Sequence, residues 1–191
     1  MRICVYGASS NEVDPKYIAA TEYLGEEMGK RGHSLVFGGG ASGMMGAAAR
    51  GMTRAGGEIL GIAPSFFNVD GVLYDKCTDF IFTETMRERK FLLEENADAF
   101  IISPGGIGTF EEFFEVLTLK QLGRHNKPIA IFNVNGYYDD LHTMLDKSIE
   151  GKFMKPCCHE LMAFFEDPGA MLDYIETCDT ATMTPEQMKF L

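Results

Sequence analysis

The chain alternates short apolar runs with longer segments of helical period, and this alternation constrains the fold more than any other feature. Runs rich in β-branched and aromatic residues predict six strands, near residues 3–7, 34–38, 58–63, 79–83, 97–103 and 128–133. The periodic segments predict helices near residues 15–31, 43–55, 86–96, 110–122, 137–150 and 168–177. Regular alternation of strands and helices predicts a Rossmann-like, three-layer α/β fold, in which helices flank a mostly parallel sheet.

No linker or internal repeat divides the chain, so we expect residues 1–191 to form a single domain. The core of that domain is expected at about residues 1–155. Residues 156–191 are expected to add a C-terminal helical segment and a tail. The last stretch, residues 180–191, loses clear periodicity and reads as a tail or a packing arm.

The charge balance argues against a nucleic-acid partner, because 17 basic and 28 acidic side chains give a formal net charge of −11. The densest basic run, Arg87, Arg89 and Lys90, is interrupted by Glu88. No stretch approaches the ~18 apolar residues of a membrane span, and the first apolar run ends at Gly7, too early for a signal peptide. Five irregularly spaced cysteines do not resemble a disulfide framework. We therefore expect a cytoplasmic protein with no membrane partner.

Three junctions between a strand and a helix are rich in glycine, at residues 7–10, 38–43 and 104–109. Glycine lets the backbone approach a ligand closely, and the helix that follows adds unpaired N–H donors and the positive end of its dipole. Right-handed crossovers place such junctions on one edge of the sheet. Tight turns need glycine in any case. Three such loops on one edge nevertheless favour a phosphate site.

The second junction also satisfies the G-x-G-x-x-G pattern, through Gly38, Gly40 and Gly43, which keeps a dinucleotide-binding function as an alternative. That function needs an acidic residue at the end of the next strand to hold the ribose hydroxyls. Here Glu58 lies at the start of that strand, and the next acid is Asp70. The spacing therefore disfavours an NAD-linked oxidoreductase.

The helix after the third junction places a carboxylate, Glu112, beside the glycine loop. The i, i+3, i+4, i+7 spacing of its apolar residues predicts a stripe that faces the core, made of Phe110, Phe113, Phe114 and Leu117. Glu112 is then expected on the polar side. Thr109 and Glu112 match a capping box, which by spacing alone is the favoured role for the glutamate. Alternatively, the carboxylate serves a sugar or a water molecule.

A basic cluster lies at the start of an earlier helix. Thr85 and Glu88 match a second capping box, so the helix is expected to begin at Met86. Met86, Arg89 and Lys90 then share one face. Two cations near a helix N-terminus are disfavoured by its dipole, and an anionic ligand would relieve that conflict. The alternative is an ordinary solvated surface.

Residues 104–112 match P-G-G-x-G-T-x-x-E, and residues 86–90 match M-x-x-R-K. Together these motifs resemble the signature of the Lonely Guy family, the cytokinin riboside 5′-monophosphate phosphoribohydrolases, and the likeness covers most of residues 1–155. The resemblance implies a homodimer with active sites near the subunit interface. It also implies hydrolysis of the N-glycosidic bond of a purine nucleoside 5′-monophosphate, AMP or an N6-modified AMP, to the free base and ribose 5-phosphate. It calls for no metal or other cofactor.

The resemblance also implies the site residues, with Arg89 and Glu112 as the catalytic pair. The residues that it places around the phosphate and the substrate are Lys90, Gly105, Gly106, Ile107, Gly108, Thr109 and Thr118. A carboxylate suits the chemistry, because it can stabilise an oxocarbenium-like sugar and orient a water molecule. The rival hypothesis is a nucleotide-binding or sensing module without turnover. Only an enzyme needs Arg89 and Glu112 together.

Overall fold

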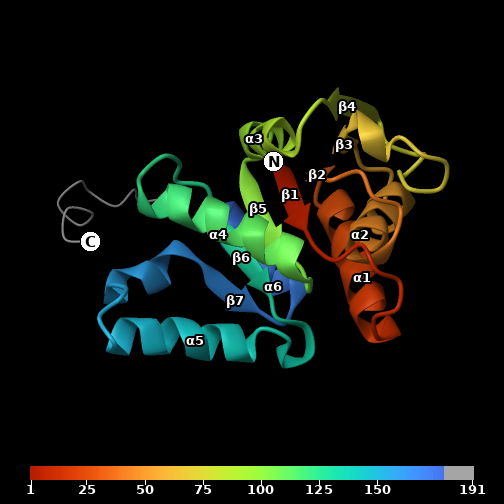
Figure 1. Cartoon of the computed structure of the whole chain (residues 1–191). Helices are drawn as coiled ribbons and strands as arrows, with labels where there is room; N and C mark the ends of the chain where they lie inside the picture. The colour runs from red at the N-terminus through yellow and green to blue at the C-terminus, as the bar shows by residue number, and fades with distance from the viewer. Residues whose placement is uncertain (179–191) are drawn as a thin grey trace.

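Within residues 1–178, the central sheet has seven strands, which all run parallel in the order β4-β3-β2-β1-β5-β6-β7 (Figure 1). The computed structural model describes residues 1–178. The strands are β1 Arg2–Tyr6, β2 Ser34–Phe37, β3 Ile59–Pro64, β4 Asp79–Thr83, β5 Ala99–Ile102, β6 Ile129–Phe132 and β7 Ala163–Phe165. The predicted three-layer α/β fold is confirmed.

Two layers of helices cover the sheet because successive side chains of each strand point to opposite faces. Ile3 and Val5 of β1 pack in the core under one layer, whereas Cys4 and Tyr6 pack under the other. The first layer consists of α1 Pro15–Lys30, α2 Gly43–Arg54 and α6 Pro168–Thr177, and the second of α3 Met86–Glu95, α4 Ile107–Gln121 and α5 Asp139–Glu150. No helix within residues 1–178 is long and apolar enough to cross a membrane.

The order of the strands reverses between β1 and β5, which pair in register from Ile3 with Ala99 to Tyr6 with Ile102. From β1 the chain moves outward through β2 and β3 to β4, and it then returns to β5 on the other side of β1. Loops diverge at such a switch point and leave a crevice at the carboxyl ends of the strands. The three glycine-rich junctions follow β1, β2 and β5, so all of them lie at this crevice.

The predicted strands and helices agree with the observed ones to within a few residues, and residues 79–83 and 168–177 agree fully. One strand, β7, was missed, because its three half-buried residues are too short to show a pattern. It pairs with β6, from Ala130 with Ala163 onward. Met171, Leu172 and Ile175 of α6 enter the core under the layer that α1 and α2 form. The predicted tail at residues 180–191 lies outside the described residues.

Candidate active site

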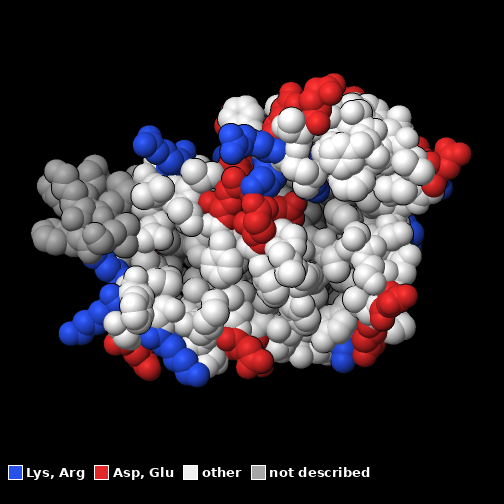
Figure 2. All heavy atoms as spheres, viewed as in Figure 1, with Lys and Arg blue, Asp and Glu red and all other residues white. Residues whose placement is uncertain are grey.

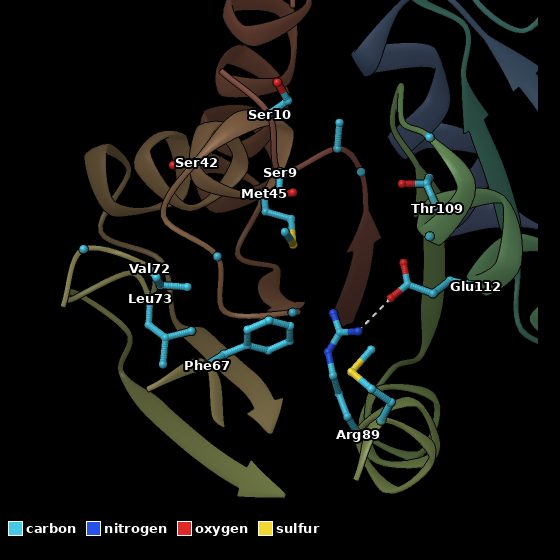
Figure 3. A pocket seen from close by; sticks show the side chains of 18 residues that line it. Ser9, Ser10, Ser42, Met45, Phe67, Val72, Leu73, Arg89, Thr109 and Glu112 are labelled. Atoms are coloured by element: carbon cyan, nitrogen blue, oxygen red, sulfur yellow. Dashed lines mark hydrogen bonds and ion pairs between the residues drawn. The ribbon is translucent and has the colours of Figure 1, made fainter. Parts of the chain in front are cut away.

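A cavity of about 680 Å³ opens at the switch point, where the predicted convergence of the three glycine-rich junctions is confirmed (Figure 3). The junctions enclose it together with α3, the first turns of α4 and the segment that follows β3. Its lining comprises Gly7, Ala8, Ser9, Ser10, Gly38, Gly40, Ser42, Met45, Phe67, Gly71, Val72, Leu73, Met86, Arg89, Gly106, Gly108, Thr109 and Glu112.

The first turn of α4 forms one wall of the cavity. The helix begins at Ile107 with Gly106 as its N-cap, so its first backbone N–H groups have no partner within the helix and its positive dipole end faces the cavity. The predicted start at residue 110, with Thr109 as the N-cap, is wrong. Thr109 instead packs onto Gly105, where an added Cβ would lie 2.1 Å from the Thr109 Oγ1. Because the helix starts inside the glycine loop, the amides without a helical partner belong to the loop residues that line the cavity.

The second capping box is confirmed, and it aims Arg89 at the cavity. The Thr85 Oγ1 accepts a hydrogen bond from the Glu88 N–H at 3.1 Å, which starts α3 at Met86 as predicted. The Glu88 carboxylate closes the motif one residue earlier than expected, because it accepts from the N–H of Glu84 at 3.0 Å. Arg89, one residue after the box, is then buried at the base of the cavity.

Two hydrogen bonds hold Arg89, and a glycine makes room for its guanidinium. Its Nε donates to the carbonyl of Ile62 at the end of β3, 3.3 Å away, and its Nη1 donates to the Glu112 Oε1, 3.1 Å away (Figure 3). The space for its guanidinium depends on Gly38 at the end of β2, because an added Cβ there would lie 2.1 Å from the Arg89 Nη2. The first glycine of the G-x-G-x-x-G pattern thus makes room for Arg89.

Burial determines the acid–base behaviour of Glu112. Its side chain is only 11% exposed, and this desolvation raises the pKa of the carboxyl to about 7, while the nearby charge of Arg89 opposes the rise. The expectation that Glu112 lies on the polar side of its helix is wrong, because Arg89 from α3 covers it. The capping role is also wrong, since the helix begins five residues before Glu112. Phe113 and Leu117 are buried as expected, whereas Phe114 is 36% exposed.

Lys90 does not join the cavity. Its Nζ lies 2.5 Å from the Glu111 Oε1 and 2.7 Å from the Glu115 Oε2, in an ion-pair cluster between α3 and α4. Figure 2 shows acidic and basic atoms side by side at this place, while further charged groups lie toward the rim of the same face. Thr118 is exposed further along α4, away from the cavity.

The structure thus brings five of the predicted site residues together at the cavity: Arg89, Glu112, Gly106, Gly108 and Thr109. Gly105 is buried and is not part of the lining, and Ile107 is 88% exposed.

An apolar wall faces the Arg89–Glu112 pair, and the sequence reasoning missed it. Phe67, Val72 and Leu73 come from the connection between β3 and β4 (Figure 3). Backbone hydrogen bonds fix this connection to the second glycine loop, from the Ala41 N–H to the Val72 carbonyl at 2.9 Å and from the Tyr74 N–H to the Gly39 carbonyl at 2.8 Å. The available signal was a long connection without helical period at the ligand-binding edge, a frequent sign of function.

Glu58 lies too far from the cavity to hold the ribose hydroxyls, as the dinucleotide alternative would require. Glu58 precedes β3 and accepts a hydrogen bond from the Ser34 hydroxyl at 3.3 Å, at the edge of the sheet opposite the cavity. Gly43, with φ of 60°, lies so close to the β1 loop that an added Cβ would be 2.2 Å from the Ala8 carbonyl oxygen. The second glycine loop therefore serves close packing around Arg89 and β1.

Within residues 1–178, the side chains that could hold a metal ion lie outside the cavity. Ligand atoms of His142, Asp146 and His159 are within 4.8 Å of one another. The first two belong to α5, and the third belongs to the 3-10 segment Pro156–Leu161. The His159 Nε2 lies 3.0 Å from the Asp146 Oδ1 at a largely exposed position, so direct contact between these two side chains accounts for their closeness. None of the three lines the cavity.

Comparisons with known proteins place the chain in a family. Residues 45–175 match the model of a family described as "Possible lysine decarboxylase". The cytokinin riboside 5′-monophosphate phosphoribohydrolase LOG7 of Arabidopsis thaliana is 37% identical over 161 residues, which cover 84% of this chain and 74% of LOG7. A second cytokinin riboside 5′-monophosphate phosphoribohydrolase of Arabidopsis thaliana, LOG2, is 35% identical over 175 residues, which cover 92% of this chain and 82% of LOG2.

A solved structure supports the fold. The Moco carrier protein from Chlamydomonas reinhardtii matches with a TM-score of 0.69 at 20% identity, and the match covers 92% of this chain and 94% of that chain. At this level of identity the likeness shows a shared architecture.

Proposed function

This chain belongs to the Lonely Guy family, and from that premise we propose that its cavity hydrolyses the N-glycosidic bond of purine nucleoside 5′-monophosphates, releasing the free base and ribose 5-phosphate. The observation that carries the proposal is the buried pair of Arg89 and Glu112, which lies beside the unpaired amides at the start of α4. An anion-binding helix end and a carboxylate with a raised pKa are the two parts that such a reaction needs.

We infer one orientation of the substrate from the positions of the amides, Glu112 and the apolar wall. The 5′-phosphate would accept hydrogen bonds from the amides of Gly106 to Thr109, since a helix N-terminus binds anions through its free N–H groups and its dipole. The sugar would then face Glu112, and the base would lie toward the apolar wall across the cavity. This proposal gives catalytic roles to Arg89 and Glu112. It assigns phosphate binding to Gly106, Gly108 and Thr109.

The chemical step needs one water molecule and no other reactant. As the bond between C1′ and the base nitrogen breaks, its electron pair leaves with the base and positive charge develops on the sugar. The Glu112 carboxylate stabilises that charge and takes a proton from the water whose oxygen bonds to C1′. The proton ends on the departing base. Arg89 polarises the base or the phosphate, and its guanidinium is already desolvated there.

The apolar wall of the cavity favours a substrate whose base carries an apolar substituent. Phe67, Val72, Leu73 and Met45 offer no strong hydrogen-bond donors or acceptors on this side of the cavity. Hydrophobic contact there would favour N6-prenylated AMP over AMP itself. The two Arabidopsis relatives are named for cytokinin riboside 5′-monophosphates, which fits this preference.

Lysine decarboxylation, the activity in the family model's description, finds no support in the cavity. That reaction relies on a lysine that forms a Schiff base with pyridoxal phosphate. The described lining contains no lysine, and Lys90 is engaged by two glutamates outside it.

The proposal includes a cytoplasmic homodimer whose active sites lie near the subunit interface. Phe91 on α3 and Phe114 on α4 are 58% and 36% exposed, on helices that also shape the cavity, so a partner subunit would cover apolar surface there. Exposed Thr118 would contact substrate only from across such an interface. Light scattering of the purified protein tests the dimer.

The first test is a chromatographic assay with AMP, isopentenyl-AMP, GMP, CMP and the matching nucleosides. Release of base from monophosphates and not from nucleosides is the expected result, because the phosphate anchors the substrate. A protein that binds monophosphates by calorimetry but releases no base would contradict the hydrolase and favour the rival function, a nucleotide sensor.

A further inference from the structure

We propose that Tyr137 is a positioning residue for the phosphate site, which orients the backbone N–H of Gly106 toward the cavity from behind the loop. The inference rests on the proposed function, because it assumes that the loop binds the 5′-phosphate. Tyr137 follows the 3-10 segment Val134–Gly136, after β6, and does not line the cavity. Its influence on a ligand therefore passes through the loop.

The contact that carries the inference is a hydrogen bond from the Tyr137 hydroxyl to the carbonyl oxygen of Gly105, at 2.6 Å. A peptide unit is planar and trans, so the C=O of one residue and the N–H of the next point in opposite directions. A carbonyl of Gly105 held by Tyr137 thus turns the N–H of Gly106 away from Tyr137. Gly106 lines the cavity, which is where that N–H can meet an anion.

The preceding peptide is held in the same way. The Ala8 N–H, in the β1 loop, donates to the carbonyl of Pro104 at 3.1 Å, which fixes the direction of the Gly105 N–H. Two consecutive carbonyls of the loop therefore accept hydrogen bonds, one from the Ala8 N–H in the cavity lining and one from the Tyr137 hydroxyl behind the loop. Flipping either peptide to point its oxygen at an anion would break a hydrogen bond, so the loop is organised before the ligand arrives.

Tyr138 provides a natural contrast. Its hydroxyl donates to the carbonyl of Ser103 at 2.8 Å, but the next residue is Pro104, which has no N–H to orient. The two adjacent tyrosines thus hold the same loop by the same type of bond. Only the bond from Tyr137 fixes the direction of an amide donor.

The local fold places Tyr137 for this task. Asn135 and Gly136 have φ of 51° and 70°, which turns the chain sharply after β6. The Asn133 Oδ1 accepts a hydrogen bond from the Tyr138 N–H at 2.6 Å and closes the turn. The ring of Tyr17, on α1, packs edge-on against Tyr137 with 5.7 Å between centroids. The hydroxyl is therefore directed by the turn that precedes Tyr137 and by the ring of Tyr17.

The test compares Tyr137→Phe with Tyr138→Phe in the full chain. Calorimetry measures the binding of ribose 5-phosphate, which carries the phosphate, and of adenosine, which lacks it. Tyr137→Phe is expected to raise the Kd for ribose 5-phosphate and the KM for AMP by roughly five- to tenfold, the worth of about one hydrogen bond. Its kcat is expected to stay within about twofold, because the lost phosphate binding is equal in the substrate complex and in the transition state. Its adenosine affinity is also expected to stay within about twofold, because adenosine has no phosphate.

Tyr138→Phe is expected to lower the melting temperature by roughly 2–4 °C while its ribose 5-phosphate affinity stays unchanged. Unchanged phosphate affinity in Tyr137→Phe would overturn the inference, as would an equal loss in both variants or an equal loss for adenosine. A wild-type protein that binds ribose 5-phosphate, with the expected loss in Tyr137→Phe, but hydrolyses no monophosphate would refute the proposed function and support this inference.

Discussion

The Arg89 guanidinium of α3 and the Glu112 carboxylate of α4 form an ion pair inside the cavity, with 3.1 Å between the Nη1 and the Oε1. Their side chains are 10% and 11% exposed, so both charges are largely withdrawn from water. Removing one partner from such a pair leaves an uncompensated buried charge. The pair therefore links catalysis, pH dependence and stability, and each can be measured separately.

Replacing Glu112 with Gln is expected to lower kcat by about 10²- to 10⁴-fold, because the amide keeps the shape of the side chain but cannot accept a proton from water. Binding of AMP, measured by calorimetry, should remain within a few-fold of the wild type. Glu111→Gln is the matched control, since Glu111 is a neighbour on the same helix that pairs with Lys90 outside the cavity. Full turnover by Glu112→Gln would remove Glu112 from the mechanism.

The activity is expected to rise with pH through about 7, where burial has placed the pKa of Glu112, because the carboxylate form performs the step. The measurement is kcat/KM for a monophosphate between pH 5 and pH 9. A profile that is flat across pH 7 would show that the ionisation of Glu112 does not control the reaction.

The same group links stability to pH. The native state retains the Glu112 proton up to about pH 7, whereas the unfolded chain releases it near the ordinary value of 4.5. The contribution of Glu112 to stability is thus full below pH 4.5 and is lost as pH rises through 7, by up to about 3 kcal/mol. Urea unfolding at pH 5 and pH 8 should show a smaller loss in Glu112→Gln than in the wild type. Equal losses would mean that the carboxyl is not desolvated.

A methyl group at Gly38 is expected to displace the Arg89 guanidinium, because its Cβ would lie 2.1 Å from the Nη2. Since the obstacle is the end of a flexible side chain, Gly38→Ala should fold and should lose activity by an order of magnitude or more, about 1.4 kcal/mol of transition-state binding. A double-mutant cycle with Arg89→Ala supplies the control. Gly38→Ala should add little in that background, and a full additional loss would show that it acts elsewhere.

Truncating Phe67 to Ala is expected to lower kcat/KM for isopentenyl-AMP about tenfold while kcat/KM for AMP changes little, because the wall would lose apolar contact with the N6 substituent. Phe66→Ala is the control, since Phe66 is the adjacent phenylalanine, is 58% exposed and does not line the cavity. Equal losses for both substrates would place the substituent outside this wall.

Local patterns in the sequence predicted the architecture correctly. Apolar runs such as that at residues 99–102 predicted buried strands, and strand–helix alternation predicted the parallel sheet. The capping box at Thr85 located the start of α3. These features depend on hydrogen bonds and side-chain spacing within a few residues, which is why one stretch of sequence was enough to predict them.

Other features depended on contacts between distant segments. Thr109 and Glu112 have the spacing of a capping box, yet α4 begins at Ile107, because the glycine loop at the switch point lets the helix start earlier. Glu112 has a polar position by periodicity, yet Arg89 from α3 covers it. Lys90 was expected to share the face of Arg89, yet two glutamates of α4 bind it outside the cavity.

The sequence by itself determined the α/β fold and the edge of the sheet at which the cavity opens, and its two motifs pointed to Arg89 and Glu112 through the resemblance to the family. Only the tertiary structure decided that the pair is buried, that Phe67 and its neighbours form the opposite wall, and that the Tyr137 hydroxyl binds the Gly105 carbonyl of the third glycine-rich loop. The physical reason is that burial, and with it the raised pKa of Glu112, results from the packing of elements far apart in the chain. No local pattern of residues encodes that packing.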